Sequence, residues 1–149
     1  MTQNLNDFLK SQEQKDYAVQ TGMSVHAQMQ NIIVDKTVEY GDKDIIDLIK
    51  TRPDLQPFFT ASAQTEVPIA GIIHGKFVSR RIDRLIINHD TKTIDFIDYK
   101  TDTNKTTFVE KYRIQITEYA ELLHSAYPNY KINGYILWLH DWQLDKIDF

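Results

Sequence analysis

The fold is decided by two short stretches, Ile82-Asp83-Arg84-Leu85 and Ile97-Asp98-Tyr99-Lys100-Thr101, which place charged residues among the apolar residues of two expected strands. Successive side chains of a strand point to opposite faces, so Asp98 and Lys100 share one face while Ile97 and Tyr99 occupy the other. Burying a carboxylate and an ammonium is costly unless they pair or bind a metal. The pattern therefore indicates a binding site, and the alternative is a solvated edge strand.

The residues around these stretches have the apolar pattern and the turns of a β-meander. The sequence predicts strands over 65–73, 76–88 and 93–101, with 89–92 as the turn between the last two. Because that turn is short, these two strands should be antiparallel neighbours. The carboxylates of Asp83 and Asp98 can then converge if the register allows.

Helices are expected on both sides of the meander. Residues 6 to about 34 have helical spacing, which places His26 on a helix next to its buried face. A second helix is predicted over 43–50, because Gly41-Asp42 precede it and Arg52-Pro53 end it. Phe58 and Phe59 should then enter the core.

A long helix is predicted over 106–125, with Tyr112, Gln115 and Tyr119 on one stripe that can face the sheet. Core packing alone would also explain the two tyrosines. The last apolar segment, 131–140, reads as a central strand. Together the elements predict a mixed sheet flanked by helices.

Length and composition fit a single domain over 1–149, long enough to form a core without disulfides. The sequence has no cysteine, which excludes a disulfide framework, a cysteine-ligated zinc and an iron–sulfur cluster, and favours a reducing compartment. Its start does not resemble a signal peptide, and its apolar runs are too short to span a bilayer. We therefore expect a soluble, cytoplasmic protein with no membrane partner.

Charge is distributed unevenly along the chain. The net charge is −4, but residues 76–113 contain nine Lys or Arg against six Asp or Glu, and the remaining residues carry −7. The segment with the two charged stretches is thus the basic part of an acidic protein, as expected for contact with nucleic acid. The alternative is an ordinary mixed-charge surface.

Five separated motifs occur in an order that is typical of one nuclease family. They are Val25-His26, Glu66-Val67-Pro68, Ile82-Asp83-Arg84-Leu85, Asp98-Tyr99-Lys100-Thr101, and Tyr112-Arg113-Ile114-Gln115 with Tyr119. In these motifs the chain resembles the RecB/AddA-type nuclease domain of the PD-(D/E)xK superfamily, from about Gly22 to Leu139. Arg80 departs from the pattern, since family members commonly carry glycine near this position, and it is either a phosphate contact or a lost glycine.

The resemblance implies an α/β restriction-endonuclease-like fold and metal-dependent hydrolysis of DNA, with exonuclease action favoured over endonuclease action. It implies catalytic roles for Asp83, Asp98, Lys100, Glu66, Gln115 and Tyr119. It implies a Mg²⁺ or Mn²⁺ ion held by His26, Asp83, Asp98 and the main-chain carbonyl of Tyr99, and a histidine ligand suits manganese better than magnesium. DNA phosphates would be contacted by Arg80, Arg84 and Arg113.

Several alternatives stay open on the sequence alone. Lys100 would either activate a water or stabilise the phosphate. Arg84 could equally pair with Asp98 or another acid, and a lone histidine such as His26 is more often a packing residue. The family works beside a helicase in recombination and double-strand-break repair, and this chain has no Gly-x-x-x-x-Gly-Lys-Ser/Thr loop for nucleotide-driven unwinding. The rival function is an inactive DNA-binding or scaffold subunit of such a helicase–nuclease complex.

Overall fold

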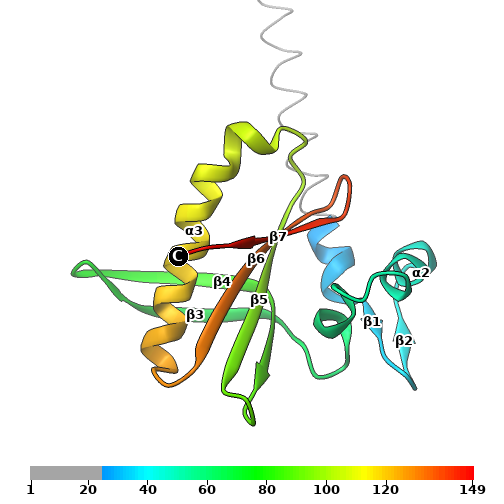
Figure 1. Cartoon of the computed structure of the whole chain (residues 1–149), viewed down its shortest axis with the longest axis horizontal. Coiled ribbons are helices and arrows are strands. Elements are labelled where there is room, and N and C mark those ends of the chain that lie inside the picture. Colours follow the sequence, from blue (N-terminus) through cyan, green and yellow to red (C-terminus); the bar gives the residue numbers. More distant parts are fainter. Residues whose placement is uncertain (1–24) are drawn as a thin grey trace, which may run out of the picture.

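A computed structural model describes residues 25–149, which form a five-stranded sheet with helices on both sides (Figure 1). Residues 25–30 are helical. The elements that follow are β1 (Ile33–Val34), β2 (Glu39–Tyr40), α2 (Lys43–Lys50), the 3₁₀ helix η1 (Gln56–Phe59), β3 (Gln64–Ile73), β4 (Lys76–Asn88), β5 (Thr93–Lys100), α3 (Lys105–Ala126), β6 (Lys131–Trp138) and β7 (Gln143–Ile147).

The five long strands lie in the order β3-β4-β5-β6-β7, and β1 pairs with β2 in a separate small ribbon. Pairing is antiparallel except between β5 and β6, which are parallel. A parallel pair needs a crossover connection, and α3 provides it. The expected β-meander is confirmed in β3, β4 and β5, and so is the expected class of a mixed sheet flanked by helices.

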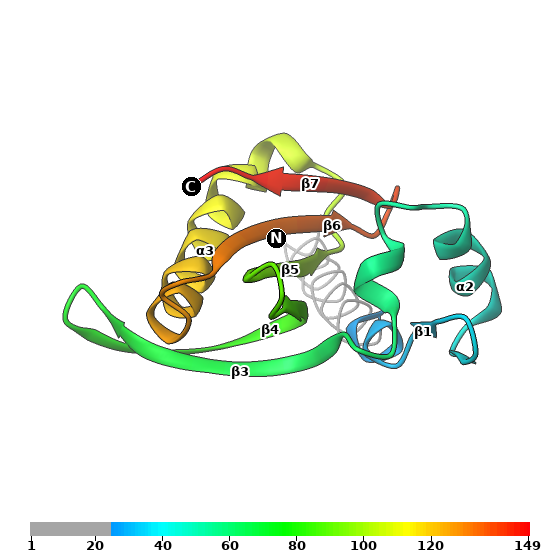
Figure 2. The same cartoon turned by 60° about the horizontal axis from the view of Figure 1, so that its bottom comes forward.

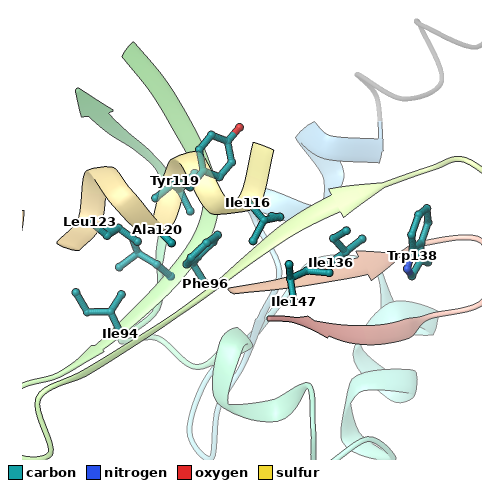
Figure 3. Packing of buried hydrophobic residues seen from close by; sticks show 11 residues of the cluster. Ile94, Phe96, Ile116, Tyr119, Ala120, Leu123, Ile136, Trp138 and Ile147 are labelled. Atoms are coloured by element: carbon teal, nitrogen blue, oxygen red, sulfur yellow. The ribbon is translucent and has the colours of Figure 1, made fainter. Parts of the chain in front are cut away.

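One layer of the core lies between α3 and the sheet (Figure 3). Ile94 and Phe96 of β5 point to this side and pack with Ile116 and Tyr119 of α3. Gly134 of β6 lies opposite Phe96, where an added Cβ would come within 2.6 Å of that ring. A side chain at Gly134 would therefore force α3 and the sheet apart.

The second layer covers the other face of the sheet. Ile97 and Tyr99 of β5 pack there with Met29 from the helical residues 25–30 and with Phe59 of η1. Figures 1 and 2 both show α3 and the α2 region on opposite sides of β5 and β6. The predicted alternation along β5 is thus confirmed, because its odd-numbered and even-numbered residues enter different layers.

Local signals in the sequence account for the boundaries of the central elements. Helix α2 has the predicted bounds, and its N-cap Asp42 accepts the Ile45 amide at 3.1 Å. Strand β4 also has the predicted bounds, and α3 and β3 each begin one residue before the predicted position. Strand β5 ends at Lys100 rather than at residue 101, and β6 ends at Trp138.

The expected helix over 6–34 is wrong at its end. The helix stops at Gln30, and Ile33–Val34 form β1 because they pair with Glu39–Tyr40. Strands β1, β2 and β7 were not expected from the sequence. Residues 6–24 of the predicted helix lie outside the described residues. Within 25–149 no helix has the length and apolarity needed to cross a membrane.

Candidate active site

The two aspartates lie where the sheet forks. Strands β4 and β5 pair only from Asn88↔Thr93 to Arg84↔Ile97, after which β4 continues beside β3 and β5 continues beside β6 (Figure 1). Asp83 and Asp98 are the next residues on each strand after that last pair. We call this point the fork. It brings the two carboxylates together without a strand between them, as the sequence predicted for a favourable register.

The backbone is irregular at the fork. Glu66 of β3 has φ of 51°, in the left-handed region that a non-glycine residue rarely adopts. The flanking pairs Thr65↔Arg84 and Val67↔Ile82 are formed, so Glu66 stands opposite Asp83 at the break. Ile82 and Leu85 both pack under α3 although they are three positions apart, an odd number, so regular alternation is interrupted between them. Strain of this kind is typical of functional sites.

Asp83 is held by the backbone of the neighbouring strand. Its Oδ2 accepts the Tyr99 amide at 2.7 Å and lies 3.5 Å from Nε2 of His26. The side chain of Asp83 is 11% exposed and that of His26 is 35% exposed, so the histidine lies at the solvent-facing side of the pair. The helical residues 25–30 thus bring His26 to the fork, as the sequence predicted.

Asp98 is buried beside both a like charge and an opposite charge. Burial raises the pKa of Asp98 to about 7, the neighbouring Asp83 carboxylate adds to this, and the Lys100 ammonium opposes both. Nζ of Lys100 lies 2.7 Å from Oδ2 of Asp98. When both carboxylates are ionised, the single positive charge of Lys100 does not neutralise them, and a bound cation would compensate the remaining negative charge.

Lys100 is positioned from the other side by α3. Its Nζ donates to Oε1 of Gln115 at 2.9 Å, and the amide nitrogen of Gln115 donates to the Tyr119 hydroxyl at 2.8 Å. The same Nζ lies 4.2 Å from the centre of the Tyr112 ring, whose hydroxyl donates to Asp102. The stripe predicted on this helix therefore faces the sheet: Tyr112 and Gln115 contact the ammonium, and Tyr119 bonds to Gln115.

Burial also perturbs the tyrosines around the site. It raises the pKa of Tyr119 to about 12, and the Asp98 carboxylate contributes to the shift. The pKa of Tyr112 is raised as well, first by burial and then by its hydrogen bond to Asp102. Both hydroxyls therefore stay protonated at neutral pH and serve as neutral hydrogen-bonding groups.

The carbonyl of Tyr99 faces the fork. The Lys100 carbonyl accepts the Leu139 amide at 2.8 Å, so it points toward β6, whereas the Tyr99 amide points toward Asp83. In a strand the amide and carbonyl of one residue point to the same edge, and successive residues alternate. The Tyr99 carbonyl oxygen therefore lies on the same side as Asp83, where the sequence placed a metal ligand.

The oxygens at the fork suit a hard divalent cation, although their number is small. Across residues 25–149 no group of three or more His, Asp or Glu side chains is close enough together to hold a metal ion. Two carboxylates and one carbonyl remain, and Mg²⁺ is commonly bound by one or two carboxylates with several waters. The donor set, and the close approach of two buried carboxylates, therefore fit Mg²⁺ or Mn²⁺.

Glu66 and the two exposed arginines lie at the border of the site. Glu66 is 3.9 Å from Arg81. Burial raises the pKa of the Tyr99 hydroxyl to about 12, and the charges of Asp83 and Glu66 add to this. Arg80 contacts Glu118 of α3 at 2.8 Å, and Arg113 lies 3.8 Å from Glu110. The Arg80 and Arg113 side chains are about half exposed, 44% and 49%, so both can reach a ligand in solvent.

Arg84 is not placed for its predicted contact with DNA. It is 1% exposed, and its guanidinium donates to the carbonyls of Met29, Phe58 and Ile32 and, through Nε, to the Tyr99 hydroxyl at 2.9 Å. It also lies 4.3 Å from the centre of the Phe59 ring. The alternative of an acidic partner does not hold either, because among the described residues its partners are carbonyls and a hydroxyl. Arg84 joins residues 29–32 and η1 to the sheet.

The sequence did not assign two residues that the structure places at the site. Tyr112 supports the Lys100 ammonium with its ring, and Asp102 fixes the Tyr112 hydroxyl. The helical stripe was a signal for Tyr112, but no local pattern marked Asp102. Comparison with known proteins adds no further residue: no protein-family model matches the chain, and no curated protein matches it.

Proposed function

We propose that the protein is a metal-dependent DNA nuclease that hydrolyses phosphodiester bonds, with the restriction-endonuclease-like arrangement of the PD-(D/E)xK superfamily. The observation that carries the proposal is the meeting of Asp83, Asp98 and Lys100 at the fork on adjacent strands, with both aspartates buried and Lys100 partly buried. Paired carboxylates beside a lysine are the groups that phosphodiester hydrolysis with a divalent cation needs. The exonuclease preference and a role in DNA repair rest on the resemblance alone.

Asp83, Asp98 and the Tyr99 carbonyl would hold a Mg²⁺ or Mn²⁺ ion, with His26 at its solvent-facing side. When bound, the ion supplies positive charge and lowers the pKa of a water. The amide of Tyr99 fixes the orientation of Asp83 before any ion binds, which reduces the cost of assembling the site. Glu66, opposite Asp83, is placed to orient a water or a second ion.

Lys100 would act on the phosphate or on the attacking water. Its ammonium already neutralises Asp98, and ion binding to Asp98 would free part of its charge for a phosphate oxygen. Gln115 keeps the ammonium at the fork, and Tyr119 keeps Gln115 in place. The side chains of α3 therefore position the lysine for chemistry at the open side of the fork.

DNA would be bound mainly through its phosphates by the basic segment 76–113, with Arg80 and Arg113 as the exposed contacts. We propose a helicase subunit or domain as partner and the cytoplasm as location. Unwinding would be the task of that partner, since this chain carries no phosphate-binding loop of the P-loop type.

One experiment tests the nuclease directly. The purified full chain is incubated with end-labelled single-stranded and duplex DNA in Mg²⁺, in Mn²⁺ and in EDTA, and products are resolved on a denaturing gel. We expect cleavage with metal and none with EDTA. The Asp98→Ala variant, purified in the same way, is the control for contaminating nucleases. DNA binding without products under either metal would instead support the inactive scaffold subunit.

A further inference from the structure

The hairpin of β3 and β4 extends past α3 to one side of the molecule (Figures 1 and 2). Its turn consists of His74 and Gly75, both with positive φ (50° and 77°), between the pair Ile73↔Lys76. A two-residue turn with this geometry matches the twist of the strands and holds them in register. The hairpin is therefore an ordered arm that leads away from the fork.

The two faces of the arm differ in exposure. One face packs on α3: Gly71 adjoins Leu122, and Arg80 contacts Glu118. The other, which we call the outer face, is exposed along its whole length and consists of three cross-strand pairs. These pairs are Pro68↔Arg81, Ala70↔Ser79 and Ile72↔Phe77.

The tip of the outer face carries two large apolar side chains in solvent. Phe77 is 71% exposed and Ile72 is 65% exposed, and the two are directly opposite in the register. Between this pair and the fork lie the small residues Ala70 and Ser79, which leave room for a ligand to approach the backbone. A large exposed apolar pair at the end of an arm indicates an interaction site.

Charge on the arm favours a polyanion as the occupant. From residue 67 to residue 82 the chain has three basic residues, Lys76, Arg80 and Arg81, and no acidic residue, although the whole chain carries −4. The Arg81 side chain is 69% exposed and stands at the root of the outer face, beside Glu66. An aromatic ring followed by a basic group along a path is the arrangement that binds single-stranded nucleic acid by stacking and phosphate contact.

An added β-strand fits the arm less well. β3 is an edge strand of the sheet, and it contains Pro68, whose missing N–H weakens the edge as a template for pairing. The apolar pair also lies on the face of the ribbon rather than along its edge. A second copy of this chain or a partner strand would therefore leave the basic residues unexplained.

We infer that the outer face of the β3–β4 hairpin is a track for a single nucleic acid strand, on which Phe77 stacks an unpaired base and Arg81 holds a phosphate near the fork. Phe77 and Asp83 are six positions apart along β4, a distance of roughly 20 Å at the usual rise per residue. The inference rests on the proposed function and deepens it: the substrate entering the fork is a single strand. Phe77 is a binding residue and takes no part in cleavage.

The test measures binding of a fluorescently labelled single-stranded oligonucleotide to the full chain in EDTA, so that cleavage plays no part. Phe77→Ala should weaken binding roughly 5-fold to 150-fold, the range of base stacking on an aromatic ring. Phe77→Tyr should retain most of the affinity, and Phe77→Leu should behave like the alanine variant because leucine cannot stack. Tyr40→Ala is the matched control, since Tyr40 is also an exposed aromatic (62%) but lies on β2, away from the arm.

Each outcome separates the inference from the proposed function. Unchanged affinity of Phe77→Ala, or recovery of affinity by leucine, would overturn the track even if the wild-type protein cleaves DNA. Stacking on Phe77 without cleavage in any metal would support the track and remove the nuclease. Sedimentation of wild type and Phe77→Ala adds a further check, because a wild-type dimer that dissociates on this substitution would assign the arm to self-association.

Discussion

A buried cation, Arg84, and a partly buried one, Lys100, lie on neighbouring strands beside the fork, and their surroundings differ in kind. Arg84 is enclosed by main-chain carbonyls, a tyrosine hydroxyl and the Phe59 ring, in the core layer opposite α3. Lys100 lies under α3 against the Asp98 carboxylate and the Gln115 side chain. The Arg84 guanidinium donates mainly to main-chain carbonyls, whereas the Lys100 ammonium contacts the side chains of Asp98 and Gln115.

The surroundings of Arg84 suit a structural role, and those of Lys100 suit the catalytic role proposed for it. Guanidinium offers five donors in a rigid plane, which suits the joining of several carbonyls from different segments. A lysine ammonium is a compact charge on a flexible chain, and its attraction to a carboxylate can be exchanged for attraction to a phosphate or a metal-bound group. Substitution of Lys100 should therefore reduce activity, whereas substitution of Arg84 should reduce the stability of the fold.

The largest effect is expected on the Lys100 side and on activity. Lys100→Ala and Asp98→Ala should each lower the cleavage rate by about a thousandfold or more, because each removes a charge that acts in the transition state. Single-turnover cleavage of labelled DNA measures this. Lys146→Ala, an exposed lysine on β7, is the matched control. A circular dichroism spectrum like that of wild type, together with a near wild-type cleavage rate in either site variant, would remove the assigned active site.

On the other side, Arg84→Met should lower the free energy of unfolding by roughly 3 kcal/mol, since several buried acceptors lose a donor at about 1 kcal/mol each. Arg84→Lys should recover only part of it, because one ammonium cannot reach all the carbonyls. Urea denaturation provides the measurement. A variant that keeps its stability and loses only DNA affinity would return Arg84 to the role of a phosphate contact.

Ionisation of the buried Asp98 should lower the stability of the folded protein as the pH rises. Its pKa is raised to about 7 in the folded protein, from about 3.9 in an unfolded chain. Its stabilising contribution is therefore complete below about pH 4 and is lost as the pH rises through 7. In EDTA, Asp98→Asn should gain stability relative to wild type by roughly 4 kcal/mol between pH 4 and pH 8, because the shift spans about three pKa units at about 1.4 kcal/mol each.

Thermal denaturation at a series of pH values tests this expectation, with the exposed Asp90→Asn as control. Saturating Mg²⁺ or Mn²⁺ should stabilise wild type at pH 8 and leave Asp98→Asn nearly unchanged, since a ligand that binds only the folded state adds stability. A difference between the variants that does not depend on pH would contradict the coupling of Asp83 and Asp98.

The smallest expected effect concerns His26, whose Nε2 lies 3.5 Å from Oδ2 of Asp83. If its imidazole completes the metal shell, His26→Ala should weaken Mn²⁺ binding by about tenfold, as for other groups that support a metal site. Cleavage should be partly recovered at high Mn²⁺, because the carboxylates still hold an ion. Calorimetric titration of both proteins measures the affinities, and equal values would leave His26 with a packing role against Tyr99.

The sequence by itself determined the elements that local chemistry defines. Helix α2 could be predicted to the residue because Asp42 caps its start and Pro53 follows its end. Alternation along β5 placed Asp98 and Lys100 on one face, and the short turn 89–92 made β4 and β5 antiparallel neighbours. The stripe on α3 followed from helical spacing alone. In each case the signal lies within a few residues of the feature.

Tertiary structure decided what depends on groups far apart in the chain. The helix before β1 ends at Gln30 because Ile33 and Val34 find strand partners, which their apolar character did not reveal. Arg84 is buried because carbonyls from two distant segments converge on it, and a charge in the sequence looks the same whether it meets carbonyls or solvent. The fork itself arises where β4 leaves β5 for β3, and only this divergence leaves the Tyr99 amide free to hold Asp83 beside Asp98.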